Sequence, residues 1–200
     1  MAINTGIFGD ETSFKERFIT DYGRLSMLVE YWKEMGLKIV LTSGAFDIFH
    51  IGHAEYLEKA KKMGDILIVG VDSDEKIRAR KGPNRPVVPE IERISVLAHL
   101  RHVDVIVLKP HNAPQYHLIN TVKPDVLVLS KTSRHSEEGI REREKLCGKV
   151  ALLEPQAITS TTAKIRILHT QGIHNFAKNL TNDFIKLIEE KLKEIQEGKQ

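Results

Sequence analysis

The sequence lacks the features that mark secreted, membrane-spanning and disulfide-bonded proteins. Its 200 residues include a single cysteine, Cys147, which excludes an intramolecular disulfide and favours a reducing compartment. The apolar runs, such as Ile66–Val71, are only as long as a strand, so we expect none to span a bilayer. Residues Met1–Asp10 do not combine a basic start with an apolar core, so no secretory signal is visible. These absences predict a cytoplasmic protein.

The sequence also lacks a large excess of charge of either sign. Thirty Lys and Arg residues stand against 27 Asp and Glu residues, which leaves a formal charge of +3. A protein that binds nucleic acid or a membrane surface usually needs a concentrated basic surface, so we expect neither partner. A hydrophobic share of 41% and a charged share of 28% are typical of a folded soluble protein.

Short apolar segments alternate with segments that favour helices. The expected strands are Ile39–Thr42, Ile66–Val71, Val103–Leu108, Val126–Leu129 and Val150–Leu153. The expected helices between them are His53–Met63, Ile91–Leu100, Ala113–Val122 and Glu137–Leu146. Continuous apolar strands alternating with helices predict a parallel sheet covered on both faces. The fold class is therefore α/β, with a doubly wound, Rossmann-like sheet of five parallel strands and helices on both faces.

The most informative segment follows the first of these strands, at Ser43–His53. Gly44 and Gly52 remove side chains where a triphosphate would need a close approach. His50 and His53 lie three positions apart at the start of a helix, where both imidazoles can donate to phosphate oxygens beside a helix N-terminus that favours anions. Two alternatives are a metal pair and two incidental histidines. No third ligand lies nearby in the sequence, so a zinc site is disfavoured.

The string Gly44-Ala45-Phe46-Asp47, followed by His50-x-Gly52-His53, resembles the signature of the cytidylyltransferase-like nucleotidyltransferases. The resemblance extends from about Leu25 to Leu168, with most similarity to the heptose-1-phosphate adenylyltransferases and less to the glycerol-3-phosphate cytidylyltransferases. It implies catalytic roles for His50 and His53. It also implies nucleotide binding by five residues of the loop, namely Gly44, Ala45, Phe46, Asp47 and Gly52.

The resemblance extends to two cationic residues further along the chain. A lysine at the position of Lys81 reaches the phosphates in such enzymes, where a cation stabilises the charge that gathers on the α-phosphate. Arg93 matches an arginine that supports nucleotide or phosphate binding in the family. The alternatives are a solvated basic patch at Arg78–Lys81 and a surface helix arginine at position 93.

A second family signature matches Ile158–Lys164. Hydroxyl groups at a helix start can bind phosphate oxygens, and a cation follows one turn later. The resemblance assigns nucleotide binding to Thr159, Ser160, Thr161 and Lys164. A plain helix cap is the alternative for the three hydroxyl residues.

One segment departs from the family pattern. Relatives carry an acidic Gly-Asp or Asp-Asp element after the fourth strand, whereas this chain has a basic segment at Ser130–Arg134. The change opens the question of which nucleotide and which acceptor are used. The segment also resembles a signature of class I aminoacyl-tRNA synthetases, but a chain of 200 residues is too short for a tRNA-binding domain beside the catalytic one.

These observations predict the organisation of the chain. Residues 1–36 form an N-terminal extension with a helix, residues 37–170 the nucleotidyltransferase domain and residues 171–200 a C-terminal helical extension. Apolar residues in Asn179–Gln196 follow helical spacing, and either core packing or the contact of a homodimer explains that stripe. Phe184 in this stripe is expected in the core.

The predicted activity is transfer of a nucleoside monophosphate from an NTP, with ATP favoured, to a small phosphorylated substrate such as a sugar 1-phosphate. The resemblance implies Mg²⁺, held mainly by the NTP phosphates and not by a metal site of the protein. Two alternatives stay open: a cytidylyltransferase acting on a polyol or amino-alcohol phosphate, and an inactive regulatory module that binds nucleotide.

Overall fold

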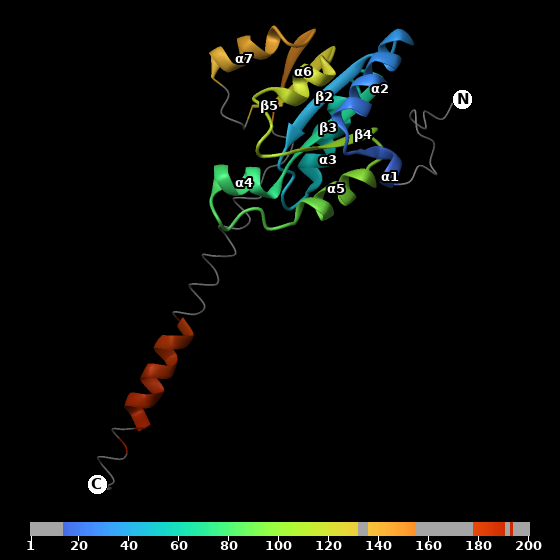
Figure 1. The fold of residues 1–200 in the computed structure, drawn as a ribbon. Coiled ribbons are helices and arrows are strands. Elements are labelled where there is room, and N and C mark those ends of the chain that lie inside the picture. The colour runs from blue at the N-terminus through green and yellow to red at the C-terminus, as the bar shows by residue number, and fades with distance from the viewer. Residues whose placement is uncertain (1–13, 132–135, 155–177, 191–192, 194–200) are drawn as a thin grey trace. The chain divides into compact units, whose positions relative to one another are not determined.

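A computed structural model describes residues 14–131, 136–154, 178–190 and 193. The chain divides into two compact units, Met1–Ile158 and Thr159–Gln200. The first unit contains the whole sheet, and the second contains the helix over residues 178–190 (Figure 1). The division of the chain at residue 170 stays a prediction.

The first unit is built on a sheet of parallel strands (Figure 1). In spatial order these are β1 (Phe18–Ile19), β4 (Val105–Lys109), β3 (Ile66–Asp72), β2 (Ile39–Gly44), β5 (Val126–Ser130) and β6 (Lys149–Leu153). Every neighbouring pair is parallel, which confirms the predicted fold class. The predicted count of five strands is wrong, because β1 adds a sixth strand beside β4.

Helices connect these strands and cover the sheet. They are α1 (Phe14–Arg17), α2 (Tyr22–Glu34), α3 (Ile51–Lys61), α4 (Asp74–Lys81), α5 (Glu90–Ala98), α6 (His117–Val122) and α7 (Glu137–Glu144). The predicted helices correspond to α2, α3, α5, α6 and α7 with shifted ends. Sequence reasoning missed α1 and α4.

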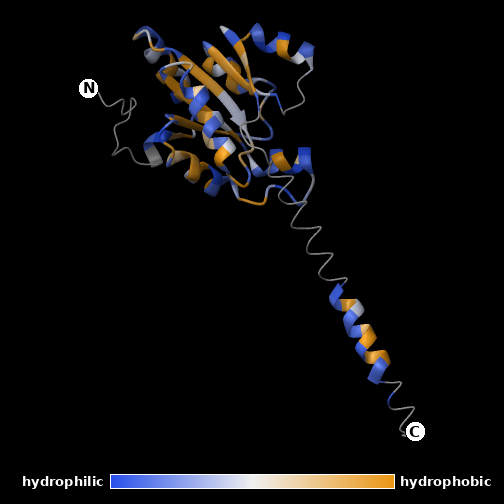
Figure 2. Ribbon diagram, turned by 180° about the vertical axis from the view of Figure 1, so that it is seen from behind, coloured by the Kyte–Doolittle hydropathy of each residue, from blue (hydrophilic) through white to orange (hydrophobic). Residues whose placement is uncertain are grey.

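The two faces of the sheet bury separate cores. Leu25 and Trp32 of α2 pack with Leu118 of α6 against one face. Leu57 of α3 and Leu97 of α5 pack against the other face. Both faces of the sheet are therefore covered by apolar side chains, which explains the continuous apolar strand sequences. Figure 2 shows much of the strand ribbon in the orange of hydrophobic residues.

The helix over residues 178–190 is exposed along its whole length. Phe184 is 60% exposed, so the expectation that it belongs to the core is wrong. The homodimer contact stays a prediction. Among the helices that the structure describes, none combines the length and apolarity needed to cross a bilayer.

Candidate active site

The candidate site lies where β2 and β3 end, at the carboxyl edge of the parallel sheet. Open α/β sheets bind ligands at this edge because the loops that follow the strands converge there. The loop after β2 runs from Ala45 to His50 and enters α3 at Ile51. Phe46 and Ile48 adopt left-handed backbone conformations, with φ of 49° and 44°. Such angles are uncommon for non-glycine residues, so the loop is held in an unusual shape by its surroundings.

The two signature histidines are brought together at the N-terminus of α3. Their rings stack with centroids 4.0 Å apart. The Gly52 amide donates to His50 Nδ1 at 3.2 Å, and the His50 amide donates to His53 Nδ1 at 3.3 Å. Because each Nδ1 accepts a hydrogen bond, each neutral imidazole carries its proton on Nε2 and offers that N–H as a donor.

The protonation state of His53 is strongly biased toward the neutral form. Burial lowers the pKa of His53 to about 4, and the positive charges of His50 and Lys81 lower it further against the opposing effect of Asp47. His53 is therefore neutral at physiological pH and acts as a hydrogen-bond donor without carrying a charge. The effect of Lys81 on the His53 pKa also places these two predicted catalytic residues near each other.

Lys81 is the last residue of α4. Ser73 caps the N-terminus of this helix, because its hydroxyl accepts from the Lys76 amide. Gly82 caps the C-terminus with a φ of 93°. Burial lowers the pKa of Lys81, and the neighbouring Arg80 and Arg85 lower it further. The ammonium group is thus held beside other cations at the carboxyl edge of the sheet, which favours an anionic ligand there.

Asp47 fastens the loop that follows α4 to the signature loop. It is 5% exposed, and its Oδ1 accepts from the amides of Val87 and Val88, both at 3.0 Å. Its Oδ2 pairs with Arg85 at 2.5 Å. These contacts assign Asp47 a positioning role. Direct contact of Asp47 with a nucleotide stays a prediction.

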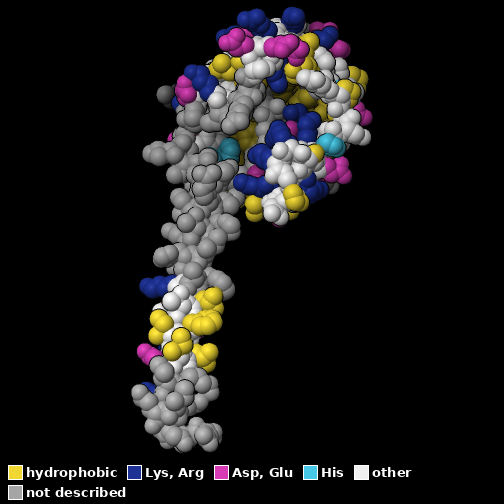
Figure 3. All heavy atoms as spheres, turned by 90° about the vertical axis from the view of Figure 1, so that its left-hand side faces the viewer, with side chains coloured by type: hydrophobic (Ala, Val, Ile, Leu, Met, Phe, Trp, Pro, Cys, Tyr) yellow, Lys and Arg dark blue, Asp and Glu magenta, His cyan; other side chains and the backbone are white. Residues whose placement is uncertain are grey.

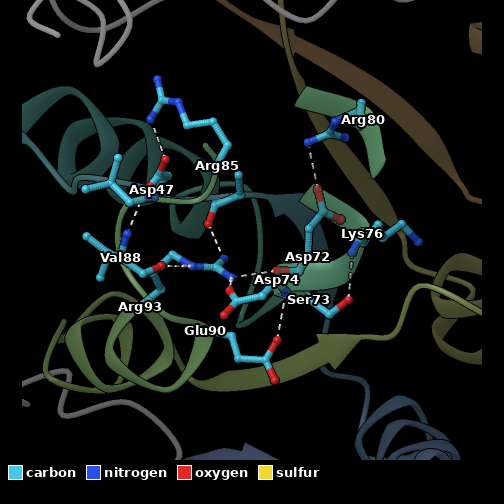
Figure 4. A network of polar contacts seen from close by, with 12 residues as sticks. Asp47, Asp72, Ser73, Asp74, Lys76, Arg80, Arg85, Val88, Glu90 and Arg93 are labelled. Atoms are coloured by element: carbon cyan, nitrogen blue, oxygen red, sulfur yellow. Dashed lines mark hydrogen bonds and ion pairs between the residues drawn. The ribbon is translucent and has the colours of Figure 1, made fainter. Parts of the chain in front are cut away.

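Arg93 is 2% exposed and donates to atoms of three separate segments (Figure 4). Its acceptors are the carbonyl oxygens of Val88, Ala45 and Asp72 and the Asp74 carboxylate. The alternative that Arg93 is an exposed arginine on the surface of a helix is therefore wrong. Since Nε, Nη1 and Nη2 all have protein partners, Arg93 supports the site by holding its loops together. Direct contact with nucleotide stays a prediction.

Asp72 is the last residue of β3, and its buried carboxylate forms ion pairs with two cations. It is 2% exposed, and it pairs with Arg80 at 3.0 Å and Lys109 at 3.1 Å. Burial acts to raise the pKa of Asp72, but Lys109 and Arg80 outweigh it and hold the pKa below its ordinary value. Sequence reasoning missed Arg80, Arg85 and Lys109. Lys109 had a usable signal, because it is a cation directly at the end of a predicted strand.

Cations dominate this edge of the sheet. Figure 3 shows Lys and Arg side chains gathered in a hollow of the face turned to the viewer. The cationic residues that act on Asp47, Asp72 or one another here are Lys76, Arg80, Lys81, Arg85 and Lys109. Among the described residues, Asp47 and Asp72 form ion pairs with Arg80, Arg85 and Lys109, so these five cations outnumber the carboxylates paired with them.

The structure gives less detail on the remaining residues that the sequence predicts for the site. Gly44 ends β2, and Gly52 is buried in the first turn of α3. Thr159, Ser160, Thr161 and Lys164 lie outside the described residues, as do residues 132–135 of the basic segment. Lys131 is described and pairs with Glu154.

The described residues do not bring three His, Cys, Asp or Glu side chains together as a metal site. The carboxylates of Asp47 and Asp72 are both engaged by cations.

The fold and the site define the class of open parallel α/β proteins that bind ligands at the carboxyl edge of the sheet. A family model described as Cytidylyltransferase-like matches residues 41–191. This match covers more than half of the chain, and the chain belongs to the cytidylyltransferase-like family.

Individual relatives agree with this assignment. The chain is 45% identical over 113 residues to the bifunctional protein HldE of a Nitratiruptor species, covering 56% of this chain and 24% of that protein. It is 38% identical over 171 residues to HldE of Geobacter metallireducens, covering 84% of this chain and 34% of that protein. The chain thus spans about a third or less of the length of these relatives.

A solved structure supports the fold. The lipopolysaccharide core biosynthesis protein from Thermoplasma volcanium superposes with a TM-score of 0.52 at 31% identity. The similarity covers 62% of this chain and all of that protein.

Proposed function

We propose that this chain is a nucleotidyltransferase that moves a nucleoside monophosphate from an NTP to a small phosphorylated acceptor. A phosphate oxygen of the acceptor attacks the α-phosphorus and forms a new P–O bond. The bond between the α-phosphorus and the oxygen leading to the β-phosphate breaks, and pyrophosphate leaves with that electron pair. An acceptor phosphate is already an anion near pH 7, so the reaction needs no side-chain nucleophile and no general base.

The observation that carries this proposal is the arrangement of His50 and His53. Backbone amides hold both Nδ1 atoms, so both Nε2–H groups are oriented donors at the N-terminus of an eleven-residue helix. Donors fixed before the reaction stabilise charge on a phosphoryl group without reorganising during the step. The neutral state of His53 at physiological pH keeps its Nε2–H available as a donor.

Lys81 supplies a positive charge that the neutral imidazole of His53 does not. Its charge lowers the pKa of His53, and Arg80 and Arg85 act on Lys81 in turn, so we expect its ammonium group to stabilise the pentavalent α-phosphate. Asp47 and Arg93 position these groups by joining the signature loop to the segments on either side of α4. Mg²⁺, held by the NTP phosphates, would neutralise charge on the leaving pyrophosphate.

The favoured substrates are ATP and a sugar 1-phosphate. Two observations support them: the resemblance of the chain to the heptose-1-phosphate adenylyltransferases, and the relative named for lipopolysaccharide core biosynthesis. The basic segment at Ser130–Arg134 differs from both family branches and makes the acceptor the open part of this proposal.

One screen tests the proposed function. The four NTPs are combined with sugar 1-phosphates, polyol phosphates and amino-alcohol phosphates in the presence of Mg²⁺, and pyrophosphate release is measured. Release with ATP and a sugar 1-phosphate is the expected result. A clear preference for CTP with a polyol or amino-alcohol phosphate would overturn the substrate assignment. Nucleotide binding without turnover for any acceptor would instead support a regulatory module.

A further inference from the structure

Lys109 reaches the candidate phosphate site from a strand that does not carry the signature. It is the last residue of β4, yet its Nζ donates to the Ser43 hydroxyl of β2 at 3.2 Å. The same Nζ lies 3.1 Å from Asp72 Oδ1 at the end of β3. One ammonium group therefore connects the ends of three neighbouring strands beside the loop that begins at Gly44.

Gly70 in β3 makes this placement possible. The register pairs Gly70 with Ser43 on one side and Val107 on the other, so the Lys109 side chain must cross β3 to reach Ser43. A Cβ built at Gly70 would lie 2.8 Å from the Cδ of Lys109 and 3.0 Å from the Cβ of Ser43. Since real Cβ atoms do not approach other atoms this closely, the glycine allows the lysine to lie across the strand.

The cations around Asp72 exceed what this carboxylate neutralises. Lys109 and Arg80 both pair with it. The charges of Lys109, Arg80 and Asp72 all act on the pKa of Lys76. Burial has the largest effect and lowers the pKa of Lys76. Repulsion by Lys109 and Arg80 lowers this pKa further, and attraction by Asp72 opposes these effects. Three cations thus share one anion, and an additional anion would relieve their mutual repulsion.

This cluster lies on a particular flank of the signature. Lys109 and Asp72 end β4 and β3, on one side of β2, while β5 and β6 lie on its other side. The Ser43 side chain is exposed, and Lys109 is 23% exposed, so a ligand can reach the ammonium group. An acceptor that presents its phosphate at His50 and His53 can therefore extend along the β3–β4 flank toward Lys109.

We propose that Lys109, together with Lys76 and Arg80, forms a second anion subsite, and that the acceptor carries a carboxylate or second phosphate besides the phosphate that attacks the NTP. This inference rests on the proposed nucleotidyl transfer, because it assigns the remainder of the acceptor to the β3–β4 flank. It places the substrate among phosphorylated sugar acids and related polyanions, and Lys109 is then a residue that determines specificity.

Matched probes test the subsite by calorimetry, with a non-hydrolysable ATP analogue bound. Glucose 1-phosphate is compared with glucuronic acid 1-phosphate, and glycerol 3-phosphate with 3-phosphoglycerate. The carboxylate member of at least one pair should bind roughly tenfold more tightly, as expected for one charge-assisted hydrogen bond. Lys109→Met should remove this preference and leave unchanged the affinities for the ATP analogue and for the member of each pair that lacks the carboxylate.

Two controls keep the test independent of folding. Lys76→Met removes a cation of the cluster that forms none of the ion pairs found in the described part of the chain, so it carries the test if Lys109→Met does not fold. Lys62→Met removes an exposed lysine at the C-terminal end of α3, where it pairs with Glu58 of the same helix. This variant should leave every affinity unchanged.

The possible outcomes separate the subsite from the reaction. The subsite would be overturned if no carboxylate probe bound more tightly than its partner. It would also be overturned if Lys109→Met lost affinity for the ATP analogue, because the lysine would then bind the NTP phosphates. Absence of pyrophosphate release in the substrate screen would overturn the proposed reaction, while the ratio of the two affinities would still decide the subsite.

Discussion

Arg93 Nη1 donates to the carbonyl oxygen of Ala45 at 2.5 Å, across 48 positions of the chain. The same guanidinium group bonds the carbonyl oxygens of Asp72 and Val88, so it joins the loop after β2, the end of β3 and the segment before α5. Because Arg93 is 2% exposed, these hydrogen bonds are formed away from water. The stability of the first unit and the shape of the candidate site therefore depend on one side chain.

Replacing Arg93 with Lys should destabilise the protein despite keeping the charge. A lysine cannot reproduce the fork that reaches Ala45, Asp72 and Asp74 together, and it leaves buried carbonyl oxygens without donors. We expect a loss of about 3 kcal/mol in the free energy of unfolding, as for a broken buried ion pair. Urea unfolding measures it, with Arg101→Lys at an exposed position as the matched control. A loss no larger than that of the control would contradict the structural role.

The sequence pattern predicts the central sheet because each strand is buried on both faces. Ile66–Asp72 is buried at every position, so its apolar run is unmistakable. In contrast, β1 has two residues, Phe18 and Ile19, and two residues carry no periodic signal. Helix α4 was missed because only Ile77 is buried in it, and a helix with one apolar contact has no stripe.

The candidate site was predictable where local geometry decides it and not where distant segments converge. The spacing of His50 and His53 at a helix start correctly brings their rings together, since both belong to one turn. The burial of Arg93 depends on carbonyl oxygens contributed by three separate segments, so its helix sequence alone favours the surface. Lys109 reaches Ser43 across Gly70 of β3, and this relation can be seen only once the strand order is known.

Substituting either signature histidine should reduce turnover and leave the fold intact. His50→Ala and His53→Ala each remove one oriented Nε2–H donor, and loss of one such donor typically lowers kcat about a hundredfold. Pyrophosphate release under saturating substrates measures kcat, and circular dichroism checks the fold. His99→Ala, at an exposed position on the far end of α5, is the control. Turnover near that of the unmodified protein in either folded variant would exclude the proposed role.

His53 should also make stability depend on pH. Its pKa in the folded protein is about 4, below the ordinary value of 6.5, so between these values the unfolded chain binds more protons than the folded one. The contribution of His53 to stability is therefore complete above about pH 6.5 and is lost as the pH falls toward 4. We expect a loss of about 2 kcal/mol, below the full linkage value because solvent reaches part of the ring.

Comparison with His53→Gln isolates this effect from the other titrating groups. The variant has no proton to bind in this range, so the difference in unfolding free energy between the two proteins should shrink as the pH falls from 6.5 to 4. Urea titrations at several pH values measure the difference. A difference that stays constant across this range would show that His53 titrates normally.

Lys81 should act on the rate more than on nucleotide affinity. A cation that engages fully only when charge gathers on the α-phosphate lowers the barrier without tightening the ground-state complex. Lys81→Ala should therefore lower kcat about a hundredfold and change the NTP dissociation constant much less. Lys81→Arg should recover only part of the rate, because a planar guanidinium group does not reproduce a compact ammonium group. Lys62→Ala is the control for a general loss of charge.

The pKa of His53 gives a second measurement of Lys81 that does not depend on turnover. The Lys81 charge helps to lower this pKa, so Lys81→Ala should raise it from about 4 toward its ordinary value, while Lys62→Ala should not. Titration of the His53 ring signals by NMR measures the shift. A raised KM at unchanged kcat would make Lys81 a ground-state phosphate ligand. If kcat, KM and the His53 pKa all stayed unchanged, Lys81 would be a solvated surface charge.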